Sequence, residues 1–197
     1  MSAIYVNSTK DKTNTRELAS DSGSAWSWGA GVPEGTVLQI IQSTKSDTSE
    51  RYNVAFDDIP GTDQSGSGSI WCVKITPSAT SSKILFISSI LVGAEAGNAS
   101  AKIKLLRDST DIAIGDAVSS NARTTYGDYG VNSYDMRSMS MTYLDSPSST
   151  SELTYKPQFR SESSTYSTWV NRPHTHTGTN VNGYTGFSTL IVMEVAG

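Results

Sequence analysis

The segment between residues 83 and 114 decides the fold of this chain. It begins with Lys-Ile-Leu-Phe-Ile-Ser-Ser-Ile-Leu-Val-Gly over residues 83–93 and continues, after a polar bend, with Ala-Lys-Ile-Lys-Leu-Leu-Arg over residues 101–107. The first run is rich in apolar and β-branched residues and is bounded by Ser and Gly, which predicts a well-buried strand. In the second run apolar residues alternate with lysines, which predicts a strand with one face on a core and the other in water.

A tight turn and a third strand follow these two runs. Asp108-Ser-Thr-Asp111 has the composition of a turn, and Ile112-Ala-Ile114 comes directly after it. We therefore predict an antiparallel meander, in which residues 93–98 join the first two strands. Because an isolated hairpin is only marginally stable in water, this meander needs a second sheet to cover its apolar face.

The composition indicates an all-β protein with one domain of ordinary size plus an extension. Of the 197 residues, 36% are hydrophobic and 17% are charged, both below the usual averages for globular proteins. Serine and threonine together exceed a quarter of the chain. No stretch shows a long amphipathic helical period, whereas short β-branched runs are separated by Ser, Thr, Gly and Asn.

Charge and cysteine content argue against several classes of protein. The net charge is −4 and no basic cluster occurs, so we expect no nucleic-acid partner. No apolar run approaches the ~20 residues of a membrane-spanning helix, so we expect no membrane insertion. The single Cys72 excludes an intrachain disulfide framework, and the first residues lack the pattern of a signal peptide. We therefore expect synthesis in a cytoplasm.

Further strands are predicted on both sides of the central segment. They are Val37–Gln42, a weaker Tyr52–Phe56, Ile70–Ile75, Trp169–Val170 and a central strand at Phe187–Val195. A hairpin is predicted where residues 138–143 alternate in polarity and residues 153–160 return after a turn at 145–152. Pro157 marks the return strand as an edge or bulged strand. The total is seven to nine strands and no helix of consequence.

Residues 1–35 differ from the rest of the chain. Apart from a possible short strand at Ile4–Val6, they are polar and rich in Gly and Ser, and cannot build a core of their own. Trp26 and Trp28 stand among small residues and are typical of anchors that insert into a partner; the alternative is that they pack on their own domain. We expect an irregular attachment arm at 1–35, followed by a β-sandwich domain at 36–197.

Several segments resemble the C-terminal domains of tail-fibre and related virion proteins of marine and cyanobacterial phages. They are Thr76–Leu85, Leu106–Gly115, the predicted hairpin between Tyr143 and Phe159, and the tail Ser188–Gly197. The similarity extends from about residue 36 to the end and involves structural patterns without a catalytic signature. The order of elements also resembles the tumour necrosis factor-like jelly roll. These resemblances imply a jelly-roll-like antiparallel sandwich, a homotrimer and receptor contacts on the loops, although a fold alone does not fix function.

Enzyme chemistry has little support in the sequence. No Gly-x-Ser-x-Gly nucleophile elbow occurs, and Cys72 lies inside a predicted strand, where a buried structural thiol is expected. Paired carboxylates occur at Asp57-Asp58 and at Asp108 with Asp111, and the second pair has the composition of a turn. We expect no catalytic residues; a carbohydrate-active enzyme, which would need two carboxylates across a cleft, is a remote alternative.

One motif has metal-ligand spacing. In His174-Thr-His176 an extended backbone would place both imidazoles on one side, so that three chains around an axis would supply six ligands. The alternative is a pair of surface histidines. No other cofactor is expected.

Aromatic residues in two Gly-, Ser- and Asn-rich loops are the better candidates for binding. The candidate residues are Tyr126, Tyr129, Tyr134, Tyr166, Trp169 and Tyr184. Rigid amphipathic rings on such loops are typical of adaptable binding surfaces, and their faces stack on sugars. The alternative is that the rings pack under their own loops or against a neighbouring subunit.

Two functions from different classes remain open at this point. The first is a trimeric tail-fibre or receptor-binding component of a virion, which joins other virion proteins through its arm and touches a host-surface glycan or protein. The second is a capsid decoration protein, a head fibre or cement protein, with the same fold but no receptor.

Overall fold

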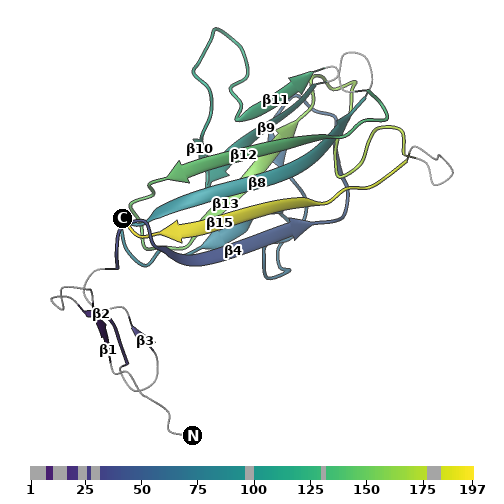
Figure 1. Ribbon diagram of the computed structural model, residues 1–197. Helices are drawn as coiled ribbons and strands as arrows, with labels where there is room; N and C mark the ends of the chain where they lie inside the picture. Colours follow the sequence, from purple (N-terminus) through teal and green to yellow (C-terminus); the bar gives the residue numbers. More distant parts are fainter. Residues whose placement is uncertain are drawn as a thin grey trace, which may run out of the picture.

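The run that opens the decisive segment forms β8 (Lys83–Ala94), the longest strand of the structure. The computed structural model describes residues 32–95, 100–129, 132–176 and 183–197 fully, and residues 8–10, 17–21 and 26–27 as backbone. These residues contain strands and no helix, so none of them forms a helix able to span a membrane. The prediction of an antiparallel all-β sandwich is confirmed (Figure 1).

The first sheet is organised around β8. Its other strands are β12 (Arg137–Asp145), β15 (Ser188–Val195), β4 (Val37–Lys45), β14 (Thr168–Val170) and β5 (Ser49–Arg51). β12 pairs with one edge of β8, and β15 pairs with the other edge and then with β4. Near the C-terminal end of β8, β14 replaces β15 as the partner of β8, and β14 also pairs with β5. The predicted central position of the C-terminal strand is therefore correct.

The second sheet is built on β9 (Ser100–Arg107) and β13 (Leu153–Arg160), which pair with each other. The outer edge of β9 carries β10 (Thr110–Ile112) and β11 (Tyr126–Tyr129). The outer edge of β13 carries β7 (Val73–Ile75) and β6 (Asp57–Asp58). Each sheet is thus four strands wide. In the second sheet two short strands share each edge position, and in the first sheet β14 and β5 continue the positions of β15 and β4.

The order of the strands is that of a jelly roll. The chain passes from β4 in the first sheet to β6 and β7 in the second, returns to β8, crosses to β9–β11, returns to β12, crosses to β13 and ends with β14 and β15 in the first. This alternation gives the two four-stranded sheets of a double Greek key.

Two predicted strand pairings are wrong. β8 and β9 lie in different sheets, so they form no meander, and β12 and β13 likewise form no hairpin. The tight hairpin between β9 and β10 does form, with Thr110 opposite Arg107. A two-residue turn cannot cross the ~10 Å between packed sheets, whereas the longer connections after β8 and β12 can.

Smaller differences concern the strand bounds. The predicted strand at residues 52–56 does not form, and the chain is paired as β5 just before it instead. Of the predicted strand at residues 70–75, only the last three residues form β7. Pro157 lies in a central strand, not at an edge. On one side it pairs with Leu105 of β9. On the other side β13 pairs with β7 up to Tyr155 and with β6 from Gln158, so Pro157 has no partner strand on that side and its missing N–H costs no hydrogen bond between strands there.

The core lies between the sheets and consists of the alternate side chains of the long strands that point inward. Inward-facing Phe86 of β8 stacks on Tyr155 of β13, with ring centroids 6.1 Å apart, and Trp71 and Leu190 are fully buried beside other aliphatic side chains. Burial of each such large side chain contributes roughly 1.5–3 kcal/mol. Cys72 is buried, as expected for a structural thiol, and burial raises its pKa.

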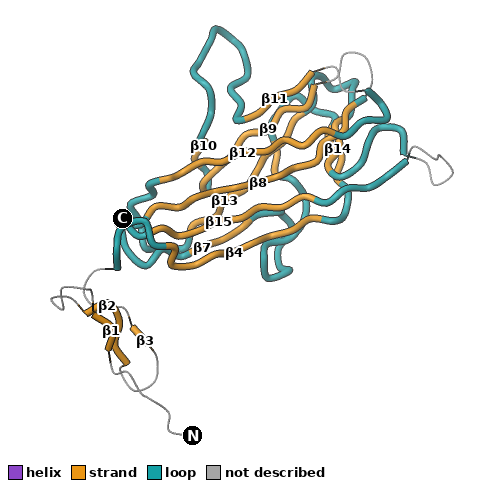
Figure 2. The backbone as a smooth tube through the Cα atoms, viewed as in Figure 1, coloured by secondary structure: helices purple, strands orange, loops and turns teal. Residues whose placement is uncertain are grey.

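The two ends of the sandwich are different, and Figure 2 shows them at opposite ends of β8, which spans roughly 40 Å. At one end the chain enters at Val32 and leaves at Gly197, and the Gly35 N–H donates to the Ala196 carbonyl over 2.8 Å. Before this point β1 (Ser8–Lys10), β2 (Glu17–Asp21) and β3 (Trp26–Ser27) form a small antiparallel sheet, so the arm is less irregular than predicted. The predicted strand at 4–6 and Trp28 lie outside the described residues.

Candidate binding surface

Loops gather at the end of the sandwich opposite Val32 and Gly197, and we call this the loop end. It contains residues 46–48, 132–136, 171–176 and 183–187. The last three of these loops are in direct contact: the Thr175 N–H donates to the Ser133 carbonyl over 2.9 Å, and the Met136 N–H donates to Tyr184 Oη over 3.1 Å.

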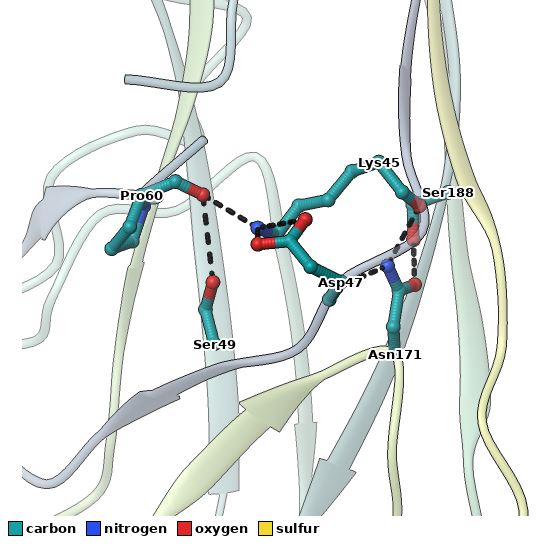
Figure 3. Close-up of polar contacts among 6 residues, drawn as sticks. All are labelled: Lys45, Asp47, Ser49, Pro60, Asn171 and Ser188. Carbon is teal, nitrogen blue, oxygen red and sulfur yellow. Dashed lines mark hydrogen bonds and ion pairs between the residues drawn. The ribbon is translucent and has the colours of Figure 1, made fainter. Parts of the chain in front are cut away.

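A buried asparagine holds the loop end in place. Asn171 directly follows β14 and has a φ of 64°, a left-handed conformation that Asn tolerates better than most residues. Its Nδ2 donates to the carbonyls of Lys45 and Asp47 over 2.8 and 3.0 Å, and its Oδ1 accepts from Ser188 Oγ over 2.5 Å (Figure 3). One side chain thus connects the turn after β4 with the start of β15.

The neighbouring Lys45 is buried and has a structural role. Its ammonium donates to both oxygens of Asp47, over 2.9 and 3.0 Å, and to the Pro60 carbonyl over 2.6 Å (Figure 3). Because all three donors can be used here, the cost of burying the charge is offset. These contacts join the turn after β4 to the loop before β7.

The predicted binding aromatics divide into two groups. Tyr129 is 61% exposed, and Tyr134 and Tyr184 are also exposed, so three of the six rings are accessible. Phe187, the last residue of the loop end before β15, is also exposed, although the pattern of aromatic loops does not single it out. Its surroundings of Gly and Ser could have suggested this.

The other three aromatics support the loops from beneath. Trp169 is only 3% exposed, because it lies in β14 between β8 and β5, and it contacts the His174 ring and the Arg172 guanidinium. Tyr126 packs on the main core, and Tyr166 packs on Ala94. For these rings the structure follows the alternative that they pack under their own loops.

The histidine pair lies under the same loops. His174 and His176 are both partly buried, and the Nδ1 atom of each is buried without a hydrogen-bond partner. Among the described residues no group of three or more His, Cys, Asp or Glu side chains is arranged to hold a metal ion. The described residues of one chain therefore bring no third ligand of these types to the pair, and the metal site between chains stays a prediction. Of the two tryptophans that are predicted to anchor the arm, Trp26 lies in β3.

A groove runs beside Tyr129, and we call it the Tyr129 groove. It has a volume of about 480 Å³ and is lined by Ser100, Lys102, Gly127, Asp128, Tyr129 and Glu162. β11 and β9 supply five of these residues, and the loop after β13 supplies Glu162.

Both carboxylates of the Tyr129 groove are paired with cations. Glu162 accepts hydrogen bonds from Lys102 and Ser100, and chiefly the bond from Lys102 holds its pKa below the ordinary value. The two oxygens of Asp128 accept from Arg137 over 2.8 and 2.7 Å. Glycoside hydrolysis needs a carboxylic acid with a raised pKa, whereas the pKa of Glu162 is lowered, so Glu162 does not suit the role of the general acid.

The acid pairs that the sequence singled out have structural contacts. Asp57 pairs with Arg51 at 2.7 Å, and Asp58 pairs with Lys156 at 2.8 Å. Asp108 Oδ1 accepts from the Thr154 N–H over 2.9 Å, and Asp111 pairs with Lys104 at 2.8 Å.

Sequence reasoning missed the charged residues of the Tyr129 groove. The alternating pattern of residues 101–107 predicts only that Lys102 faces solvent. Glu162 is the one acid between Arg160 and the end of β14, in a run of Ser and Thr, and that isolation was the available signal. Only the fold brings β9, β11 and the loop after β13 together.

No protein-family model matches the chain, and no curated protein matches it. The resemblance to phage virion proteins therefore depends on the residues alone and stays a prediction.

Proposed function

We propose that this chain is a non-enzymatic structural protein of a phage virion, a tail-fibre or receptor-binding component that docks by its N-terminal arm. The observation that carries the proposal is the division of the molecule into two ends. The arm joins the sandwich where Gly35 pairs with Ala196, whereas the exposed Tyr134 and Tyr184 lie at the loop end. A protein that links a particle to a host surface needs its two binding regions far apart.

The proposed protein acts as a homotrimer, and the outward face of the first sheet supports association. Along one row of this face Ile40, Met193, Leu85 and Leu144 are cross-strand neighbours. Among the outward-facing residues of β4, β15, β8 and β12 only Lys83, at the arm end, is charged. The face measures roughly 20 by 30 Å, the same order as the ~800 Å² that each partner contributes to a standard interface.

Adsorption to host cells tests the recognition part of the proposal. Replacing Tyr134 and Tyr184 together by Ala removes two exposed rings of the loop end, and we expect weaker adsorption of the particle with an unchanged fold. Tyr52→Ala is the matched control, because Tyr52 is 64% exposed but lies in none of the predicted recognition loops. Circular dichroism checks the fold of each variant.

The capsid decoration alternative predicts a different result of the same experiment. Particles with the double variant would then adsorb normally and would instead show reduced stability of the head. Unchanged adsorption with a folded variant would therefore contradict recognition by the loop end, and together with reduced stability of the head it would favour decoration.

A further inference from the structure

We propose that the Tyr129 groove binds a neutral saccharide. This inference names the ligand class for the proposed function and rests on it. The groove lies on the edge strand β11, where Tyr129 marks one end of the strand that pairs with the beginning of β9. Its lining combines a glycine, an exposed aromatic ring and side chains of both charges.

The shape of the groove leaves space for a ring-shaped ligand above Gly127. A Cβ atom at Gly127 would approach no atom closer than 3.7 Å, the distance to Lys102 Cγ, so the strand itself could accommodate a side chain. The absence of one keeps the middle of the groove open. Tyr129 lines the same groove, and its side chain, on the same face of β11 as Gly127, is 61% exposed. Aromatic faces of this kind stack on the C–H faces of sugars.

The polar groups of the groove suit hydroxyl groups, which both donate and accept. The contacts of Glu162 with Ser100 and Lys102 go to Oε2, so within the described residues Oε1 remains available as an acceptor. Asp128 lies between Gly127 and Tyr129 along β11 and opposite the buried Ala101, so its side chain lies on the other face of the strand, where both of its oxygens accept from Arg137. The Lys102 ammonium has three N–H donors, of which its contacts with Ser100 and Glu162 use two.

The charge balance favours a neutral ligand. On the face of β11 that carries Gly127 and Tyr129, the cation of the groove lining, Lys102, is matched by the anion Glu162, and the two are already paired. An anionic sugar or a phosphate would have to displace a carboxylate from its partner, which leaves a charge uncompensated. A neutral saccharide needs no such exchange.

A glycan array that carries both neutral and acidic oligosaccharides tests the proposal with the full chain. We expect binding to neutral oligosaccharides, and calorimetric titration with the best of them gives the dissociation constant. Glu162→Ala and Tyr129→Ala should each raise this constant about tenfold, because each removes one main contact of the ligand. Gly127→Val should abolish binding by filling the groove.

Matched controls separate the loss of the site from the loss of the fold. Gly115→Val adds the same side chain at a glycine whose Cβ would meet nothing closer than 4.0 Å, outside the groove. Tyr52→Ala removes an equally exposed ring elsewhere. Both controls should bind the oligosaccharide like the unmodified protein.

Several results would overturn the proposal. They are binding to acidic glycans alone, binding to no glycan, and binding that survives Gly127→Val; release of reducing sugar from a bound oligosaccharide would point to an enzyme. If the groove binds no glycan but the Tyr134 and Tyr184 double variant still reduces adsorption, the proposed function is retained and only the saccharide site is refuted. If the groove binds but the chain is missing from particles, the proposed function fails and the site remains.

Discussion

At the scale of the single residue, Glu194 carries a buried negative charge that no cation of the described residues pairs with. Burial alone would raise its pKa, but hydrogen bonds from Ser78, Gln39 and Ser82 outweigh that effect, and the pKa is lowered. Four donors reach the carboxylate: the Ser78 N–H and Oγ at 2.6 Å, Gln39 Nε2 at 2.6 Å and Ser82 Oγ at 2.7 Å. These bonds attach the turn before β8 to β15 and β4.

This geometry predicts a loss of stability in acid. A carboxylate whose pKa is lower in the folded than in the unfolded state stabilises the fold above its unfolded pKa. That contribution is lost as the pH falls from about the ordinary value of 4.5 through the lower folded pKa. Glu194→Gln should reduce the free energy of unfolding at pH 7 by about 2–3 kcal/mol and should flatten the dependence on pH below 5. Denaturation by urea at pH 7 and pH 3, at one protein concentration, measures both effects.

Glu152→Gln is the control for this prediction, because Glu152 is exposed in the loop between β12 and β13. It should leave the curve at pH 7 almost unchanged. An equally small effect of Glu194→Gln would show that the amide satisfies the same donors and that the charge has no role.

Asn171 shows what the sequence cannot predict about a single residue. Its sequence context suggests a turn, but only the fold shows that its side-chain amide contacts Lys45 and Ser188.

At the scale of the elements, alternating polarity located strands better than it located their partners. The pattern of β8 and β15 was sufficient to place both correctly, because their apolar runs are long. The pairing of β8 with β9 was predicted wrongly because both sheets of a sandwich show the same alternation. The sequence therefore indicates which residues face the core but not which sheet holds them, except where a turn is as short as the one at Asp108.

The outward face of the first sheet gives a prediction at this scale. Ile40→Asp and Leu144→Asp place charges at the two edge strands of the apolar row, where both side chains are exposed in the single chain. If this face joins copies, each substitution buries an unpaired charge in the interface and should convert the assembly into monomers. Light scattering and analytical ultracentrifugation report the mass.

Val118→Asp is the control, since Val118 is 62% exposed, like Ile40 at 61%, but lies in the loop between β10 and β11. It should leave the mass unchanged. A monomeric unmodified chain would contradict the interface outright, and a mass of two chains would keep the face but exclude a threefold arrangement.

At the scale of the whole molecule, the sequence indicated two functional regions but not their geometry. It singled out the aromatic loops, and three of the six rings are exposed. It could not predict that Trp169 is buried, because a ring on a short strand is covered only when the neighbouring strands come from distant parts of the chain. For the same reason it could not assemble the Tyr129 groove from three separate segments.

The separation of the two ends also shows where the arm can be cut. Gly35 N–H donates to the Ala196 carbonyl and the Ala196 N–H donates to the Thr36 carbonyl, each over 2.8 Å, so residues 33–36 belong to the sandwich. Deletion of residues 1–31 keeps this pairing, and we expect a soluble trimer with an unchanged circular dichroism spectrum of the sandwich that no longer joins the particle. Complementation of a phage that lacks the gene, followed by immunodetection on purified particles, measures incorporation.

Substitution of the two tryptophans makes this last prediction sharper than the deletion alone. If Trp26 and Trp28 are the anchors, truncating each ring to Ala should weaken docking by ~2 kcal/mol or more, as is common where a buried Trp fills a partner's pocket. Incorporation of the double variant should then fall almost as far as that of the deletion, while the mass of the free protein stays the same. Normal incorporation of the deleted chain would refute attachment through the arm. If only the double variant is incorporated normally, other residues of the arm make the docking contact.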